Sequence, residues 1–335
     1  MGDTCLLGLK KKKGIPLSIK GIKLINADAE ILRIENLIRD AIEPRIIGIK
    51  IRAIKLKNGN GIIVVRIPKS WNPPHKVKFK KSNRFYLRNS NGVYEASVEE
   101  LRQIFTMGNT LRDAIIKFRD KRIEQLIKGD GLLPEIDKGL VLLHLVPFGA
   151  FDRMIEINTI DLNWNSNKFK LIGDGAKSVS LNFDGLLIKN DANVPKSYTQ
   201  IFRNGIIEAA KTNLYHHSRE NFSIPGKRFH KYMIETIVNF LEQMKVFNIP
   251  PPIEILISLV SVKGVYIAFK NFDPYESTKI DRVNLKLPEI VINDYGKVLD
   301  YHKLLRPAFD RFCNAVGYAY SPYFTDGDIF NEGLI

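Results

Sequence analysis

Apolar and polar residues in the first hundred positions form patterns that predict short strands around one amphipathic helix. The clearest pattern is helical and covers residues 28–42. Its apolar positions recur at helical spacing and are Ile31, Ile34, Leu37, Ile38 and Ala41. Asp28 is the expected N-cap, and Pro44 ends the helix because it disfavours the helical conformation at the residue before it.

A β-hairpin follows this helix. In residues 49–57 apolar positions are interleaved with lysines and arginines, so one face of the strand looks buried and the other cationic. Residues 58–61 read Asn-Gly-Asn-Gly and supply residues that tolerate positive φ in a tight turn. Residues 62–67 are continuously apolar and β-branched except for Arg66, which predicts a central strand.

Basic and aromatic residues are concentrated directly after the hairpin. Residues 69–81 predict a lysine-rich loop that contains a Pro-Pro pair, and residues 84–88 predict a further strand. A helix is expected at 97–105, because Ser97 followed by Glu100 is a capping box.

The remaining elements of the first part are weaker predictions. Residues 4–9 predict a buried strand, residues 10–14 a turn and residues 15–24 short β-structure. A second helix is expected at about 110–128, and the Gly-Asp-Gly at 129–131 breaks the chain and marks a domain boundary.

The second part mixes helices and strands over about 200 residues. The expected strands are 140–147, a strand pair or one long strand at 179–189, and a hairpin formed by 253–260 and 264–270. Residues 198–211 are expected to be a strand that runs into a helix. Two further helices are expected at 227–247 and 301–317.

The excess of basic over acidic residues lies in the first part of the chain. The whole chain has a net charge of +15. Residues 1–128 hold 28 basic against 12 acidic residues, whereas residues 129–335 hold 23 against 24. A basic module joined to a neutral one is typical of a protein in which one domain meets a polyanion. A basic but otherwise ordinary solvated surface is the alternative.

The candidate site is the basic and aromatic stretch from Ser70 to Arg88, together with the lysine just before it. Lysines and arginines would contact phosphates, and flat rings could stack on bases. The predicted nucleic-acid-binding residues are Lys69, Trp71, His75, Lys76, Lys78, Lys80, Lys81, Arg84, Tyr86 and Arg88. The alternative carries equal weight from composition alone: the rings belong to the core and the lysines guard an edge strand against aggregation.

Enzymatic signatures are weak. Residues 173–178 contain the residue types of a phosphate-binding loop without its spacing. His216, His217 and His230 could hold a metal, but adjacent histidines point in different directions and no carboxylate lies at a ligand spacing. Pairing with nearby arginines is the favoured role of the acidic residues in 28–42. Cys5 and Cys313 are too far apart in sequence to suggest a disulfide framework. We therefore predict no catalytic residue, no metal site and no cofactor.

Several motifs in residues 2–105 resemble the Schlafen-type AlbA domain of bacterial proteins, which are often described as divergent AAA or ATP-binding proteins. The matching features are Arg66-Ile67-Pro68-Lys69-Ser70, Pro74-His75, the run from Arg84 to Ser90, Ala96-Ser97 before a helix, Glu43-Pro44-Arg45 and Gly2-Asp3 through Gly8. Residues 129–335 also resemble the second half of such proteins. The cues there are Leu145-Val146-Pro147, Asn182-Phe183-Asp184-Gly185, the run from Tyr198 to Gly205, and Leu305-Arg306-Pro307 with Asp310.

The resemblance implies an α/β domain related to the chromatin protein Alba, with affinity for DNA or RNA. Some Schlafen relatives are nucleases that use an acidic triad, and two of those acids lie before the strand found here at residues 4–9. The chain starts inside that signature and carries Lys10–Lys13 where acidic residues are common, so we expect an N-terminally incomplete domain without nuclease activity.

The sequence thus predicts an α/β (α+β) protein: an Alba-like mixed sheet with helices at 1–108, a linker helix at 109–130 and a second α+β domain at 131–335 that acts as a sensor or partner domain. The expected function is nucleic-acid binding, with DNA favoured over RNA, in the cytoplasm, without membrane association and with a homodimer left open. The alternatives are a metal-dependent nuclease or an ATP-binding regulator whose acidic segment is missing, and a degraded gene product.

Overall fold

The computed structural model describes residues 3–12, 15–46, 48–68, 70, 73–80, 82–89, 92–129, 132–133, 139–152, 155–173, 175, 177–190, 194–212, 216–218, 221–269, 278–331 and 333. The chain forms two compact units, Met1–Arg112 and Asp113–Ile335. Each unit combines helices with largely antiparallel sheets, so the α+β fold class is confirmed. Within the described residues, no helix is both long and apolar enough to cross a membrane.

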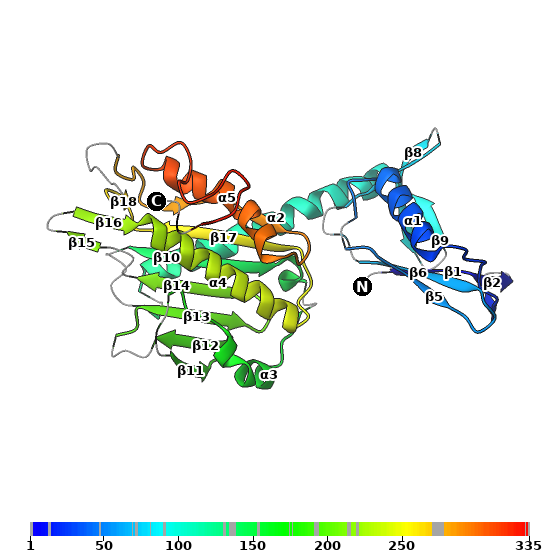
Figure 1. Cartoon of the computed structure of the whole chain (residues 1–335), viewed down its shortest axis with the longest axis horizontal. Coiled ribbons are helices and arrows are strands. Elements are labelled where there is room, and N and C mark those ends of the chain that lie inside the picture. The colour runs from blue at the N-terminus through cyan, green and yellow to red at the C-terminus, as the bar shows by residue number, and fades with distance from the viewer. Residues whose placement is uncertain are drawn as a thin grey trace. The chain divides into compact units, whose positions relative to one another are not determined.

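The first unit is built on a three-stranded antiparallel sheet with one helix against it (Figure 1). Its strands, in the order β1-β6-β5, are Asp3–Leu7, Gly61–Ile67 and Lys50–Lys55. β6 is the central strand, as its continuous apolar run predicted. Ile34 of helix α1 (Ala27–Ala41) packs on Ile63 and Val65 of β6 and forms a small core with them.

Two local predictions for this region are wrong. β1 is a strand, but Thr4 to Leu7 are exposed rather than buried, because β1 lies at the edge of the sheet. The N-cap of α1 is Asn26 rather than Asp28: the side chain of Asn26 accepts a hydrogen bond of 3.0 Å from the amide of Ala29. Both asparagine and aspartate fill this role, so the residue type alone did not distinguish the two positions.

The first unit also contains a four-stranded antiparallel sheet and a two-stranded sheet. The order β4-β7-β8-β9 of the four-stranded sheet corresponds to Ile42–Glu43, Lys76–Phe79, Ser82–Asn89 and Gly92–Glu95. The prediction of one loop over 69–81 is therefore wrong in its second half, because β7 pairs with strands on both sides. A two-stranded sheet is formed by β2 (Leu9–Lys12) and β3 (Ile15–Ile19), so the turn expected at 10–14 starts as a strand.

One long helix replaces the two helices that were expected after residue 96. Helix α2 runs without a break over Val98–Ile127. The capping box is confirmed: the Ser97 hydroxyl accepts from the amide of Glu100 at 3.2 Å, and the amide of Ser97 donates to the Glu100 carboxylate at 2.9 Å. The boundary between the two units falls inside α2, so its last turns are part of the second unit, whereas the sequence suggested a separate linker helix over 109–130.

The second unit is an eight-stranded antiparallel sheet between helices. The strand order is β11-β12-β13-β14-β10-β17-β19, with β20 also paired to β17. The strands are Lys177–Leu181, Gly185–Asn190, Ser197–Phe202, Ile207–Thr212, Leu140–Pro147, Ile253–Val260, Leu285–Lys286 and Ile290–Ile292, in the order given. A small separate sheet contains β15 (His216–Ser218), β16 (Asn221–Pro225) and β18 (Tyr266–Ala268).

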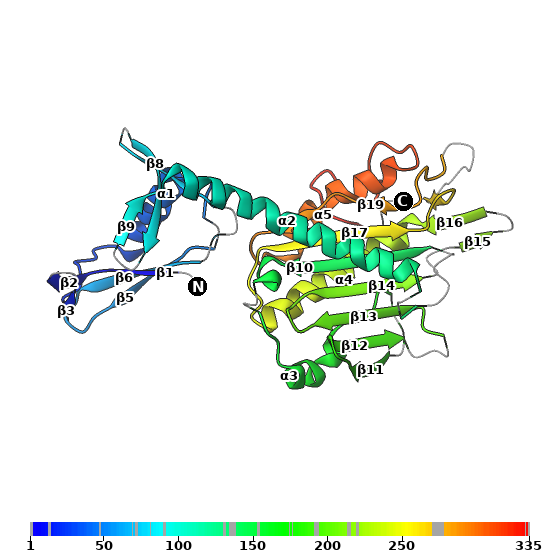
Figure 2. The ribbon, with the colours of Figure 1, turned by 180° about the vertical axis from the view of Figure 1, so that it is seen from behind.

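Helices cover both faces of the large sheet. One face packs on α4 (Gly226–Val246) and α5 (Val298–Asn314), which lie in front of the sheet in Figure 1. The other face packs on Ile123 and Leu126 of α2, and Figure 2 shows α2 in front of this face. The short helices η2 (Phe148–Phe151), α3 (Thr159–Trp164) and η3 (Ser166–Lys168) follow β10. β10 is buried over its whole length because both of its faces are covered.

Two predictions for the second unit are wrong in their connections. Residues 198–211 form two paired strands, β13 and β14, instead of a strand and a helix. β17 and β18 do not form a hairpin, since β18 pairs in parallel with β16. The first error arises because a short apolar run fits a strand or a buried helix equally well. The second arises because the partner of β18 is β16, about 40 residues earlier in the chain.

A buried carboxylate joins α2 to three strands of the large sheet. Glu208 of β14 has no exposed surface. Arg122 of α2 donates to its two oxygens at 2.7 and 2.6 Å, His144 Nε2 donates at 2.9 Å and the Tyr198 hydroxyl at 2.6 Å. Burial alone would raise the pKa of Glu208, but the hydrogen bonds from Arg122 and His144 outweigh it and lower the pKa to about 2. The carboxylate therefore stays ionised inside the unit.

Removal of Arg122 should destabilise the second unit. In the Arg122→Met variant the charge of Glu208 stays buried without its main partner, which costs about 3 kcal/mol, the lower end of the range for broken buried pairs, because Arg122 is itself partly exposed. Urea unfolding followed by circular dichroism measures the loss. Arg33→Met is the control, since Arg33 forms an exposed pair with Glu30. Equal shifts of the midpoint in the two variants would contradict this role of Glu208.

Acid should also weaken the second unit through Glu208. Above pH 4.5 the carboxylate is ionised in both the folded and the unfolded state, and its full contribution to stability is present. As the pH falls from 4.5 towards 2, the unfolded chain binds a proton that the folded state does not, so the free energy of unfolding decreases. Unfolding measured from pH 5 to pH 2.5 should show a shallower decrease in Glu208→Gln than in the wild type. Identical slopes would rule out Glu208 as a source of the pH dependence.

Candidate nucleic-acid interface

The register of the four-stranded sheet separates the predicted binding residues onto two faces. Directly paired residues of antiparallel strands point to the same side, and neighbours along a strand point to opposite sides. Lys76 pairs with Phe85, and Lys78 pairs with Asn83. Arg84 pairs with Val77 and therefore lies on the other side. Strand alternation thus divides cations that the sequence presents as one cluster.

One face of this sheet is occupied by contacts within the first unit. The ammonium groups of Lys76 and Lys78 lie 3.1 and 2.6 Å from the same carboxylate oxygen of Glu43. The hydrogen bonds from Lys78 and Lys76 lower the pKa of Glu43. On the same face, the Phe85 ring meets Phe105 of α2 edge to face, with centroids 6.1 Å apart.

The opposite face combines exposed rings with cations, and we call it the hairpin face. It consists of Phe79, Lys80, Arg84, Tyr86 and Arg88 on β7, β8 and the turn between them. Phe79 is 63% exposed and Tyr86 is 43% exposed. Glu95 of β9 forms an ion pair with Arg84 on this face.

The turn between β7 and β8 presents Lys80 at the tip of the hairpin. Lys80 adopts a positive φ of 54°, which few residues other than glycine, asparagine and aspartate adopt easily. Its ammonium lies 5.5 Å from the centroid of the Phe79 ring, at cation–π distance. A shallow depression at this turn is lined by Phe79, Lys80, Ser82, Asn83 and Arg84. A ring and two cations are therefore presented together to solvent.

His75 connects two segments of the first unit. Its Nδ1 lies 2.6 Å from the carbonyl oxygen of Pro44 and its Nε2 lies 2.5 Å from the hydroxyl of Ser70. A carbonyl can only accept, so Nδ1 carries the proton, and in the neutral ring Nε2 accepts from the Ser70 hydroxyl. Both ring nitrogens are engaged within the unit, which is the geometry of a structural residue.

The ten predicted residues thus fall into separate groups. Lys80, Arg84, Tyr86 and Arg88 share the hairpin face, whereas Lys76 and Lys78 lie on the other side of the sheet and His75 is half-buried. Lys69, Trp71 and Lys81 lie outside the described residues. The list omitted Phe79, although its alternation with Lys78 would have placed it on the side of Arg84 once β7 was recognised as a strand.

Of the three histidines considered as metal ligands, His230 has a structural role, whereas the side chains of His216 and His217 lie outside the described part of the chain. His230 is fully buried: its Nδ1 donates to the Gly226 carbonyl at 2.7 Å and its Nε2 lies 2.9 Å from the Ser321 hydroxyl. Burial lowers the pKa of His230 to about 3, so the ring is neutral. Among the described residues, no three histidine, cysteine or acidic side chains are grouped as metal ligands would be.

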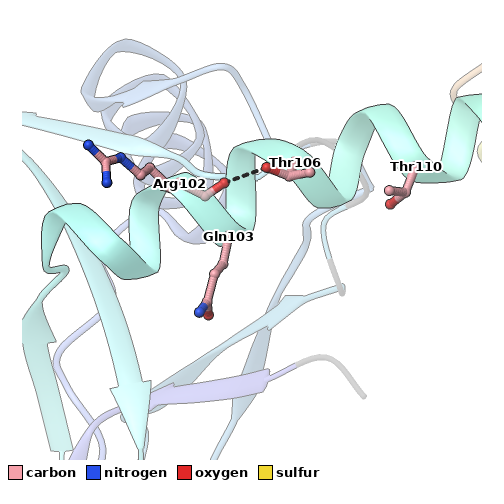
Figure 3. Close-up of a pocket in the computed structure, with 4 residues that line it drawn as sticks. All are labelled: Arg102, Gln103, Thr106 and Thr110. Atoms are coloured by element: carbon pink, nitrogen blue, oxygen red, sulfur yellow. Dashed lines mark hydrogen bonds between the residues drawn. The ribbon is translucent and has the colours of Figure 1, made fainter.

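A second shallow depression lies along α2 and is shown in Figure 3. It is lined by Arg102, Gln103, Thr106 and Thr110, with no acidic residue, histidine or cysteine among them. The Thr106 hydroxyl donates to the carbonyl of Arg102 at 2.7 Å, a bond within the helix itself. These residues suggest no catalytic chemistry.

The comparisons with known proteins identify the domain that carries the hairpin face. Residues 2–97 match the family model described as Schlafen, AlbA_2. The first unit therefore contains a Schlafen-type AlbA domain, and the prediction made from its motifs is confirmed. This family is consistent with a nucleic-acid-related or ATPase-like domain. No curated protein and no solved structure matches the chain.

Substitution of His75 should lower stability much more than substitution of Tyr86. His75→Ala removes two hydrogen bonds of a half-buried ring, so we expect a loss of about 1–3 kcal/mol in the free energy of unfolding. Tyr86→Ala removes an exposed ring and should change it by less than about 0.5 kcal/mol. Thermal and urea unfolding of both variants give the comparison. A larger loss in Tyr86→Ala would show that the ring of Tyr86 is part of the core instead.

Proposed function

We propose that the first unit binds nucleic acid through the hairpin face, with DNA as the expected partner. The observation that carries the proposal is the placement of exposed aromatic rings and cations on one face of a β-sheet. Exposed rings can stack on bases, and neighbouring cations can contact the phosphates that link those bases.

The two faces of the sheet differ in what they can offer to a ligand. Lys76 and Lys78 share the carboxylate of Glu43, so binding a phosphate there must compete with an existing ion pair. The hairpin face has Glu95 as its carboxylate, paired with Arg84, and it adds Lys80 at the tip of the turn. Phe79 and Tyr86 are exposed on this second face. On the other face Phe85 packs on Phe105, and Tyr94, which is 37% exposed, donates its hydroxyl to Glu100.

The charge distribution supports the same unit as the binding module. The excess of basic over acidic residues lies within residues 1–128, and the rest of the chain is close to neutral. A local excess of this kind raises the concentration of a polyanion near the surface and accelerates its association. The match to the Schlafen AlbA_2 family agrees with a nucleic-acid-related role.

Neutralising the hairpin face should weaken binding and reduce its salt dependence. In the double variant Arg84→Gln, Arg88→Gln, we expect the slope of log K against log salt to fall by about 1.4–1.8, or 0.7–0.9 for each lost phosphate contact. Fluorescence anisotropy with labelled duplex and single-stranded DNA, and with RNA of the same sequence, measures both quantities. Lys76→Gln, Lys78→Gln is the matched control, because it removes the same charge from the other face of the same sheet.

The contribution of the aromatic rings to affinity can be measured separately from that of the cations. Tyr86→Ala should weaken binding of single strands by about 1–3 kcal/mol, the cost of one lost base–aromatic stack, and should affect duplex DNA less.

Equal losses of affinity in the Arg84/Arg88 and Lys76/Lys78 variants would mean that the protein responds only to overall charge. Absence of binding by the wild type at low salt would end the proposal.

A further inference from the structure

The first unit has a second cationic surface, on the three-stranded sheet β1-β6-β5. On one side of this sheet, Ile63 and Val65 pack on Ile34 of α1. Strand alternation points Lys50 and Arg52 of β5 and Arg66 of β6 to the other side, where all three are exposed. We call these three residues the basic sheet face.

The cations of the basic sheet face are close neighbours. Lys50 pairs directly with Arg66 across the two strands. Two residues further along β5, Arg52 pairs with Val64. Residues directly opposite in antiparallel strands have Cβ atoms about 5 Å apart, and residues two apart along a strand are about 7 Å apart. Like charges at these separations repel each other and destabilise the sheet.

No carboxylate relieves this repulsion within the described part of the chain. Neither β5 nor β6 contains an acidic residue. The side chains of Lys50, Arg52 and Arg66 form no hydrogen bond or ion pair with another described residue, in contrast to Arg84, which pairs with Glu95. A surface of this kind becomes more stable when it binds an external anion.

The shape of the surface indicates an extended anion. The three cations stand on an open sheet, and a single small anion is usually held in a concave site by converging backbone amides. Several charges spaced along a strand match the repeated phosphates of a polymer. The unit that carries them is also the one that holds the basic excess of the chain.

We propose that the basic sheet face is a second phosphate-binding surface for the nucleic acid that contacts the hairpin face. The identity of the partner rests on the proposed function, whereas the site itself rests on the three uncompensated cations. One strand of nucleic acid or one duplex would then be bound by two surfaces of the same unit.

The test is the triple variant Lys50→Gln, Arg52→Gln, Arg66→Gln in the full chain. We expect the slope of log K against log salt to fall by about 2–3, from three lost phosphate contacts, and the affinity to fall at least about tenfold at 0.1 M salt. The control Lys245→Gln, Lys263→Gln, Lys303→Gln removes the same charge from exposed positions of the second unit and should leave the slope unchanged. A charge-retaining variant, Lys50→Arg, Arg52→Lys, Arg66→Lys, should bind like the wild type.

Thermal unfolding shows whether the triple variant is folded. If the triple variant is unfolded, the single variant Arg52→Gln is used instead, with an expected change in slope of about 0.7–0.9. If the wild type binds nucleic acid and these substitutions leave the slope unchanged, the basic sheet face has no such role and the proposed function stands. If the wild type binds no nucleic acid, both proposals fail. Tighter binding to phosphatidylserine vesicles than to nucleic acid, lost in the triple variant, would assign the surface to a membrane and overturn the inference.

Discussion

A buried ion pair between Glu208 and Arg122 links helix α2 to the large sheet of the second unit. Glu208 lies in the middle of the large sheet without exposure, and such a carboxylate is tolerated only when donors surround it. Arg122, His144 and Tyr198 supply those donors from α2, β10 and β13. Because the guanidinium approaches both oxygens at once, it also determines the rotation of α2 against the sheet. Apolar contacts of Ile123 and Leu126 complete the same interface.

Side-chain interactions stabilise α2 near both of its ends. At the start, the Ser97–Glu100 capping box satisfies backbone amides that would otherwise lack partners. Near the end, Arg122 is held by Glu208. Aromatic contacts lie between these points, since Phe105 meets Phe85 and Phe118 meets the ring of His144. A break near residue 108 was expected from local sequence, whereas a single helix covers Val98–Ile127.

Strand alternation also determines how the first unit presents its charge. In sequence, the lysines and arginines of residues 69–88 look like one group. In the fold, the pairing of β7 with β8 sends Lys76 and Lys78 to one side and Arg84 and Arg88 to the other. The same alternation on β5 and β6 separates the apolar residues that pack on α1 from Lys50, Arg52 and Arg66. The basic residues therefore form two surfaces. On the hairpin face Arg84 pairs with Glu95, whereas the cations of the basic sheet face form no ion pair with another described residue.

The sequence by itself determined the features that depend on neighbouring residues. These include the helical face of residues 28–42, the Asn-Gly turn before β6, the Ser97–Glu100 cap and the motifs that identify the Schlafen-type AlbA domain. Each rests on periodicity, turn chemistry or a short motif, all of which are readable along the chain. The exposed edge position of β1, the strand β7 within a predicted loop and the β13–β14 pair were not readable in this way.

Only the tertiary structure decided which distant groups meet. Arg122 and Glu208 are 86 positions apart, and no local feature of either segment predicts that the two residues form an ion pair. The hydrogen-bond partners of His75 and His230, Pro44 and Ser321, likewise lie far away in sequence. A buried polar group must find a donor or acceptor wherever the chain brings one close, and the register of the strands decides which side of a sheet that partner must occupy.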